Sequence, residues 1–331
     1  MQWSETLSKL VLAVDAITLI AGLPANLLAL YTFIQKVKQR CTSIDVFLLS
    51  LTISDLIFLL FLPIRMKETV DRKWTLSSFL CPLSGLIFYT TIYNSTLLLT
   101  AISVERYLGV AFPIKYKLKR RPLYAVIACV IFWVVSMAHC SMVYIIQYYK
   151  GNETHSNTSN TEACYYKFNN EQLEILLPSR LEVFFVLFFV PFIICSFCYI
   201  KFILTLSRLP NINPQKRFRA NGLALVTLLV FIICFLPYNV SRVVGFIGWY
   251  SPEWRSYALL PCTFNACLDP LIYYFSSPTL QGTCNTLKTG LINWIHRSCC
   301  RWRWHSCTQL NCTHSYTQPS KLTEINESTA F

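Results

Sequence analysis

Charged residues are scarce in this sequence. They make up 14% of its 331 residues, while 54% are hydrophobic, and a soluble domain of average composition is about one-quarter charged. Acidic residues are the scarcer kind, because 16 Asp and Glu stand against 29 Lys and Arg, which gives a net charge of +13. This composition argues against an ordinary soluble domain and indicates a protein that lies within a membrane.

Seven apolar segments recur along the chain, and each is long enough to cross a bilayer, which takes about 20 residues. They leave no room for a separate soluble catalytic domain, and no internal repeat indicates a transporter built from duplicated halves. We therefore predict an all-α membrane protein in which residues 10–276 form a seven-transmembrane helix bundle. The seven segments are residues 10–34, 44–66, 79–110, 122–148, 176–207, 218–247 and 255–276.

The basic residues predict how the chain is oriented in the membrane. They concentrate after the first and third segments and between the fifth and sixth, whereas the loop before the fifth segment carries glutamates. The basic residues between 65 and 73 are a mild exception. Residues 1–9 are too short for a signal peptide, so we expect an extracellular N-terminus and an uncleaved first helix. The positive net charge then reflects the enrichment of Lys and Arg on the predicted cytoplasmic side. It does not indicate a nucleic-acid surface, since no basic–aromatic module accompanies it.

The chain after the seventh segment divides into two parts. Residues 277–297 are expected to form a short amphipathic helix on the inner leaflet, because their apolar side chains recur at helical spacing. Residues 298–331 are polar and are expected to form a disordered cytoplasmic tail. Cys299 and Cys300 are candidate palmitoylation sites, with free thiols as the alternative. The apolar positions of the expected helix are Leu280, Leu287, Leu291, Trp294 and Ile295.

The loop at residues 149–175 carries two features of an outer-side segment. Asn152 and Asn157 begin Asn-x-Thr and Asn-x-Ser sequons for N-glycosylation. The cysteine count of 15 is odd, so at least one thiol is unpaired within the chain. Cys81 and Cys164 are the two cysteines predicted on the outer side, where thiols oxidise. A disulfide between them would hold this loop over the helix bundle.

Glu105-Arg106-Tyr107 ends the third apolar segment. A carboxylate and a guanidinium at a membrane boundary are costly to bury and usually functional. Together with other markers in chain order, this motif resembles the rhodopsin-like, class A G-protein-coupled receptors. The resemblance implies a receptor and not an enzyme, and no Gly-x-Ser-x-Gly or His-Glu-x-x-His motif argues otherwise. The other markers are Asn26, Asp55, Trp133, Pro191, Pro237 and the run Asp269-Pro270-Leu271-Ile272-Tyr273.

The resemblance assigns roles in activation. Pro237, with Phe235 beneath it, is implied to kink the sixth helix so that its inner half swings outward. Residues 216–219 offer no acid to Arg106, so we expect Glu105 to be its only partner. Asp269, Pro270 and Tyr273 form the corresponding element of the seventh helix. The resemblance also implies a sodium ion, with a hydrated polar network as the alternative. Its ligands would be Asp55, Ser95, Asn265 and Asp269.

Basic and aromatic side chains gather in the outer half of the chain's helices. Arg180, Arg242 and Arg255 lie on the fifth, sixth and seventh segments. A single arginine there would more often extend to the lipid headgroups, but three on consecutive helices indicate an anion site, since a guanidinium binds a carboxylate in bidentate fashion. Glu182 is expected to be an internal partner of the cluster. The other candidate ligand-binding residues are His139, Tyr89, Tyr93 and Tyr238.

Several stretches narrow the resemblance to the free fatty acid receptors, in particular to the short-chain type 2. Those receptors bind acetate, propionate and butyrate through two arginines and two histidines, and Arg180, Arg255 and His139 match three of these positions. Position 242 departs, because the pattern has histidine where this chain has Arg242. The similar stretches are residues 22–30, 105–113, 120–124, 237–241 and 268–271.

The predicted function is that of a plasma-membrane receptor for short-chain carboxylates. The resemblance implies signalling through heterotrimeric G proteins of the Gi/o and Gq types, binding of arrestin, and contact with membrane lipids. No nucleic-acid partner and no cofactor other than the sodium ion are expected. A receptor for a longer fatty acid or for another small anionic ligand is the alternative, with a transporter as a further one.

Overall fold

The structure is a computed structural model. It describes residues 5–114, 116, 122–148, 170–208, 213–250, 252–277, 280–286, 288–290, 292 and 294. Within this part of the chain the regular structure is helical, which confirms the predicted all-α fold. The chain divides into two compact units, Met1–Gln281 and Gly282–Phe331, and the first contains the helix bundle.

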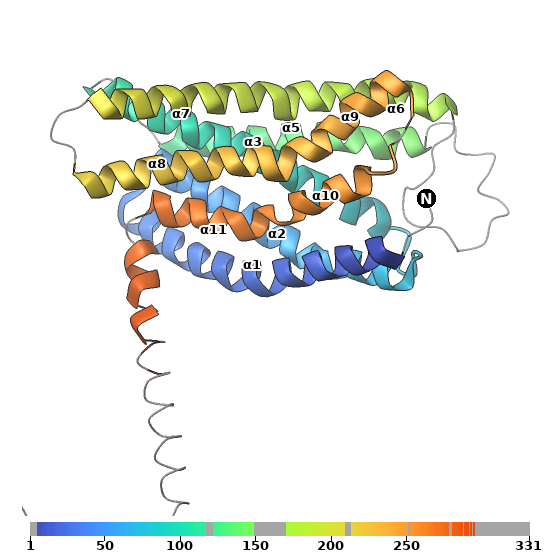
Figure 1. The fold of residues 1–331 in the computed structure, drawn as a ribbon, viewed down its shortest axis with the longest axis horizontal. Coiled ribbons are helices and arrows are strands. Elements are labelled where there is room, and N and C mark those ends of the chain that lie inside the picture. Colours follow the sequence, from blue (N-terminus) through green and yellow to red (C-terminus); the bar gives the residue numbers. More distant parts are fainter. Residues whose placement is uncertain are drawn as a thin grey trace, which may run out of the picture. The chain divides into compact units, whose positions relative to one another are not determined.

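The helices of the first unit form crossings, which are helical spans that run from one end of the bundle to the other. The crossings lie side by side, and successive ones run in opposite directions (Figure 1). The first four crossings are α1 (Glu5–Arg40), α2 (Ser43–Asp71), α3 (Leu80–Ala111) and α5 (Pro122–Tyr148). The fifth comprises α6 (Asn170–Phe184), the π-helix η1 (Phe185–Phe189) and α7 (Val190–Arg208). The sixth comprises α8 (Pro214–Leu229), the π-helix η2 (Val230–Phe235) and α9 (Leu236–Gly248), and the seventh α10 (Arg255–Thr263) and α11 (Asn265–Ser276).

The seven crossings agree with the seven predicted segments. Six helices of the described chain are long and apolar enough to cross a membrane, and the seventh is divided at Phe264, so each half is shorter. Some helices extend past the predicted segments, as α1 does from Glu5 to Arg40, whereas the fourth and seventh crossings coincide with theirs. Hydropathy detects only the apolar part of a helix, whereas backbone hydrogen bonding continues into its polar ends.

Prolines inside the crossings free backbone carbonyls, and neighbouring helices supply the missing donors. Pro191 has no N–H, so the carbonyl of Leu187, four residues earlier, loses its usual donor. The hydroxyl of Thr96 in α3 donates to that carbonyl at 2.7 Å. In the same way Asn26 Nδ2 in α1 donates at 2.8 Å to the carbonyl of Ala266, four residues before Pro270. These side chains satisfy backbone groups that lipid leaves without a partner.

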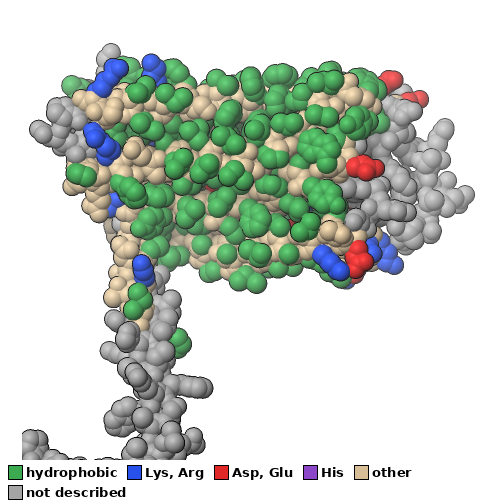
Figure 2. Space-filling model, viewed as in Figure 1, with side chains coloured by type: hydrophobic (Ala, Val, Ile, Leu, Met, Phe, Trp, Pro, Cys, Tyr) green, Lys and Arg blue, Asp and Glu red, His purple; other side chains and the backbone are tan. Residues whose placement is uncertain are grey.

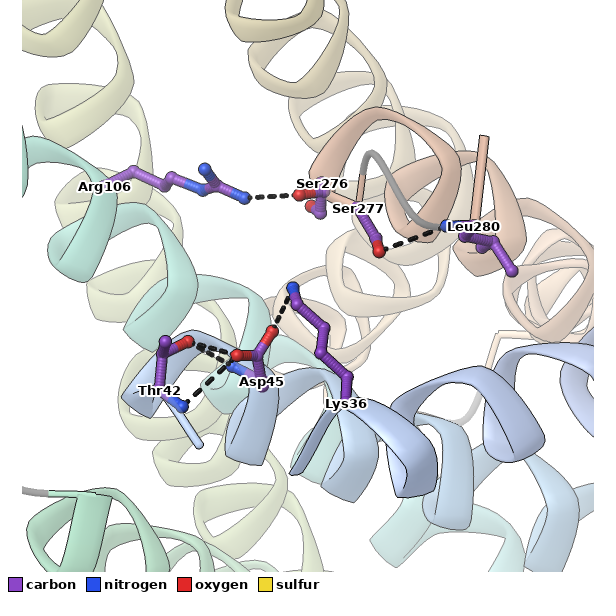
Figure 3. Close-up of polar contacts among 7 residues, drawn as sticks. All are labelled: Lys36, Thr42, Asp45, Arg106, Ser276, Ser277 and Leu280. Atoms are coloured by element: carbon purple, nitrogen blue, oxygen red, sulfur yellow. Dashed lines mark hydrogen bonds and ion pairs between the residues drawn. The ribbon is translucent and has the colours of Figure 1, made fainter. Parts of the chain in front are cut away.

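The turn between α1 and α2 is held by side chains at the start of α2. Thr42 and Asp45 form a capping box, in which each side chain bonds the other's backbone N–H. Lys36 of α1 donates to the buried carboxylate of Asp45 (Figure 3). Directly after α11, the Ser277 hydroxyl accepts a hydrogen bond from the N–H of Leu280 at 3.3 Å (Figure 3). This is the bond that an N-cap residue makes at the start of a helix.

Side chains on the bundle surface are sorted along its length. In the view of Figure 2, hydrophobic side chains cover the sides, and Lys and Arg lie near the end where α7 ends and α8 begins. Acidic side chains gather at the opposite end, together with other Lys and Arg. An apolar band between polar ends is what a protein that spans a bilayer requires.

The segment after the bundle is described only in part. Residues 280–286 and 288–290 are helical. Ile292 and Trp294 are exposed. Leu287, Leu291 and Ile295, on which the amphipathic prediction also depends, lie outside the described residues, as does the predicted tail at 298–331.

Candidate functional site

Arginines from three helices come together, and two of them bond one tyrosine hydroxyl. Arg180 in α6 and Arg242 in α9 are 7% and 5% exposed, and Arg255 at the start of α10 is partly buried. The hydroxyl of Tyr238 accepts from Arg255 Nη2 at 2.7 Å and from Arg242 Nη2 at 3.5 Å. Arg242 Nη1 also donates to the Arg180 carbonyl at 3.5 Å. The fold therefore brings the predicted arginines together.

Aromatic rings pack against two of these guanidinium groups, those of Arg242 and Arg255. The central carbon of Arg242 lies 5.3 Å from the ring centroid of Tyr93 and 5.1 Å from that of Tyr238. Arg255 lies 5.0 Å from the Tyr238 ring, and Tyr89 stacks on the same ring at 5.9 Å. The negative face of an aromatic ring attracts a cation, most strongly where water is excluded. The rings thus hold the arginine side chains in position.

Glu182 has a different contact from the one the sequence suggested. Its Oε1 lies 3.0 Å from Nε2 of His139 in α5, and its side chain is 52% exposed. The other ring nitrogen of His139 is 2.8 Å from the carbonyl of Val135. His139 and Glu182 therefore form a pair that joins α5 to α6 beside the arginine cluster.

A small cavity lies deeper in the bundle, at the predicted sodium site. Its volume is about 10 Å³, near the lower limit for one water molecule. Asn265 Nδ2 donates to Asp269 Oδ2 at 2.9 Å, and the Tyr273 hydroxyl donates to Asp55 Oδ2 at 2.7 Å. Within the described residues, Asn265 Oδ1 and Asp269 Oδ1 are buried and accept no hydrogen bond. The cavity is lined by Asp55, Phe58, Thr91, Ile92, Ser95, Cys262, Asn265 and Ala266.

These groups fit a hard cation. Two buried carboxylates and a hydroxyl provide oxygen atoms of the kind that such ions prefer, and two buried oxygens remain available to coordinate one. Asp269 is not among the lining residues, but Asn265 connects it to the cavity wall. The structure therefore brings all four predicted ligands to one place.

Arg106 extends to the seventh helix at the end of the bundle that is predicted to face the cytoplasm. Its Nη2 donates to the carbonyl of Ser276 at 3.1 Å (Figure 3). Glu105 accepts a hydrogen bond from the hydroxyl of Tyr116, and the ring of Tyr107 packs 6.2 Å from that of Phe197 in α7. The Ser276 carbonyl is a partner of Arg106 that the sequence did not predict, while an ion pair with Glu105 stays a prediction. Sequence reasoning missed Ser276 because a backbone carbonyl leaves no signal in residue type.

The sixth crossing contains a π-helix shortly before Pro237, the residue predicted to kink it. The π-helix η2 ends at Phe235, two residues before Pro237. Phe235 is fully buried, and its ring lies edge-on to that of Phe231 at 5.8 Å. π-Helical segments and prolines are the usual sites of helix bending.

The modification sites can be followed only in part. Cys81 is disulfide-bonded, whereas its predicted partner Cys164 lies outside the described residues, so their pairing stays a prediction. The sequons at Asn152 and Asn157 and the thiols of Cys299 and Cys300 also lie outside the described residues.

Known proteins resemble the chain over most of its length. Residues 25–273 match the family model of the seven-transmembrane receptors of the rhodopsin family. The chain is 44% identical over 310 residues to free fatty acid receptor 3 of Mus musculus. This match covers 93% of the chain and 94% of that receptor. It is 48% identical over 276 residues to free fatty acid receptor 2 of Mus musculus, and 47% identical over 276 residues to that of Homo sapiens, with 83% of each chain covered in both cases. The matches confirm the resemblance for type 2 and extend it to type 3.

Proposed function

The chain belongs to the rhodopsin family of seven-transmembrane receptors and, within it, to the free fatty acid receptors, and we propose that it is activated by short-chain fatty acids such as acetate, propionate and butyrate. It is a multi-pass membrane receptor and not an enzyme. A fatty-acid-sensing receptor of this family binds a small ligand and couples to G proteins.

One observation carries the proposed ligand: Arg180 and Arg255 come from separate helices to a single buried, aromatic-lined site. A guanidinium group binds a carboxylate through two parallel N–H bonds. We infer that the carboxylate of the ligand is clamped between Arg180 and Arg255, with His139 beside it. The ring of Tyr238 stacks on Tyr89 and packs on two of the guanidinium groups, and the preference for a short acyl chain rests on the resemblance to the short-chain receptors.

The inner end supports signalling through G proteins. Arg106 bonds the end of α11, and η2 with Pro237 provides a hinge in the sixth crossing. Coupling through Gi/o and Gq, and later binding of arrestin, are part of the proposal. So are an extracellular N-terminus at the plasma membrane, glycans at Asn152 and Asn157, acylation of Cys299 and Cys300, and a disulfide between Cys81 and Cys164.

A sodium ion at Asp55, Ser95, Asn265 and Asp269 is a further part of this proposal. The ion would neutralise the buried carboxylates and supply the contacts that Asn265 Oδ1 and Asp269 Oδ1 lack within the described chain. Replacing sodium chloride by choline chloride should lower the unfolding temperature of the purified receptor, and Asp55→Asn should abolish the difference. An equal unfolding temperature in both salts would contradict the sodium site.

A chain-length series of carboxylates tests the proposed ligand. Cells that express the receptor are given acetate, propionate, butyrate, hexanoate and decanoate, and G-protein activation is measured. Short acids should activate at lower concentration than decanoate. Arg180→Ala and Arg255→Ala should each reduce potency more than about a hundredfold, since removing one partner of a buried ion pair costs about 3–5 kcal/mol.

The exposed Lys67, which pairs with Asp71 at the outer end of α2, provides the matched control. Lys67→Ala removes one exposed positive charge at the end of α2 and should leave potency within about twofold. Unchanged potency in both arginine variants, at normal surface expression, would contradict the clamp. Activation by decanoate alone would favour the alternative of a longer fatty acid.

A further inference from the structure

Arg242 is a buried cation beside the proposed Arg180–Arg255 clamp. Its side chain bonds two neutral oxygens, the Arg180 carbonyl and the Tyr238 hydroxyl, both at 3.5 Å. These distances are at the long limit of a hydrogen bond. Arg242 Nε is buried without a hydrogen-bond partner in the described part of the chain. The guanidinium of Arg242 is therefore weakly satisfied for a group that is only 5% exposed.

Arg242 and Arg255 share one neutral acceptor. Both direct an Nη2 atom at the hydroxyl oxygen of Tyr238, at 3.5 and 2.7 Å. Neither forms an ion pair with a residue that the structure describes, because Glu182 faces His139 and Asp15 faces Arg65. The rings of Tyr93 and Tyr238 attract the cations but carry no net charge. Among the described residues, the site therefore holds positive charge that a single ligand carboxylate at Arg180 and Arg255 would leave partly unmatched.

We propose that this site also takes short dicarboxylates and binds them more tightly than monocarboxylates. One carboxylate occupies the Arg180–Arg255 clamp, and the second binds Arg242 beside the Tyr238 hydroxyl. An uncompensated buried charge is costly, and a charged partner relieves that cost. The two guanidinium groups lie within 3.5 Å of one oxygen, so the two carboxylates must be close together, as in malonate or succinate. This inference rests on the proposed function, because it assumes the clamp.

The test compares ligands that differ by one charge. Succinate and its monomethyl ester are similar in size, but the ester lacks the second carboxylate. G-protein activation is measured for both, and for propionate, with the wild-type receptor, Arg242→Gln, Arg242→His and the exposed-charge control Lys67→Gln. Succinate should be at least about tenfold more potent than its monoester at the wild type and at Lys67→Gln. The ratio should fall to within about threefold at Arg242→Gln.

Arg242→His provides the second variant if Arg242→Gln fails to reach the surface, and its ratio should also fall. Equal potency of succinate and its monoester at the wild type would overturn the inference, as would a ratio that neither Arg242 variant changes. A propionate response without a preference for succinate contradicts the dicarboxylate site but leaves the proposed function standing. Failure of every carboxylate, with wild-type receptor at the cell surface, contradicts both.

Discussion

Single polar side chains decide how this apolar protein satisfies its backbone. Thr96 and Asn26 donate to carbonyls that prolines leave without their usual donor. An unsatisfied carbonyl inside a membrane protein has no water to bond. These two residues therefore stabilise the bent crossings in a way that their residue types alone do not reveal.

Thr96→Val is expected to destabilise the receptor although it preserves the side chain's shape. The substitution removes the hydroxyl that donates to the Leu187 carbonyl, and an unsatisfied buried acceptor costs about 1–3 kcal/mol. The unfolding temperature of the purified receptor should fall. Thr205→Val is the matched control, because the Thr205 hydroxyl bonds the Lys201 carbonyl within one regular helix and is partly exposed. Equal losses in both variants would contradict this role.

The neighbours of an arginine side chain decide whether it is buried in the bundle or extends to the lipid headgroups. Arg180 and Arg242 are buried among helices, whereas a lone arginine in a membrane helix would more often extend to the headgroups. The burial of Arg242 is accommodated by the tyrosine rings and the hydroxyl that surround its guanidinium group. The same side chain therefore serves as an anchor or as a ligand contact according to its neighbours.

At the scale of elements, α1 and α11 approach closely because Gly22 has no side chain. A Cβ atom at Gly22 would lie 3.3 Å from the carbonyl oxygen of Ala266. That carbonyl is the acceptor for Asn26 Nδ2. Since the obstacle is backbone, it cannot move aside as a flexible side chain would.

Gly22→Val should push α1 away from α11 and weaken the Asn26 bond. Overpacking of this kind costs about 1–3 kcal/mol, so thermal stability and surface expression should both fall. Ala21→Val, on the exposed side of the same helix, creates the same side chain at an exposed position by adding two carbons rather than three, and it should be nearly neutral. A neutral Gly22→Val would show that α1 and α11 are not tightly packed here.

At the scale of the whole molecule, charge is distributed unevenly between the two ends. Residues 183–252 contain no acidic residue, although five basic residues lie between 201 and 219. Arg106 bonds α11 and Arg217 Nη2 donates to the Ser207 carbonyl of α7. At this end of the bundle Arg106 and Arg217 therefore both bond backbone carbonyls, and α8 carries no acidic residue.

We expect measurable ligand-free signalling for this reason, and Arg217→Glu should reduce it. The substitution places a carboxylate at the base of α8, where it can attract Arg106, and a shift of one kcal/mol changes a two-state ratio about fivefold. Basal G-protein activation at matched surface expression is the measurement. Arg208→Glu, which makes the same charge change at the end of α7, is the control. A wild-type baseline equal to that of untransfected cells, with no change in Arg217→Glu, would contradict the idea.

The sequence by itself determined the number of crossings, the family and the identity of the basic residues in the outer half. Those features depend on hydropathy and on residue types at fixed order, which a linear chain displays. Seven apolar segments and the markers from Asn26 to Tyr273 were therefore predictable.

Only the tertiary structure decided which groups meet. Glu182 faces His139 rather than the arginines, Arg242 bonds Tyr238, and Arg106 reaches the Ser276 carbonyl. Many of these helices are apolar on both lipid-facing and buried sides, so their sequence periodicity gives little information about rotation. A carbonyl acceptor exists at every position, and its availability depends on where a proline or a helix end lies nearby. These contacts follow from how the helices pack, which the linear sequence does not display.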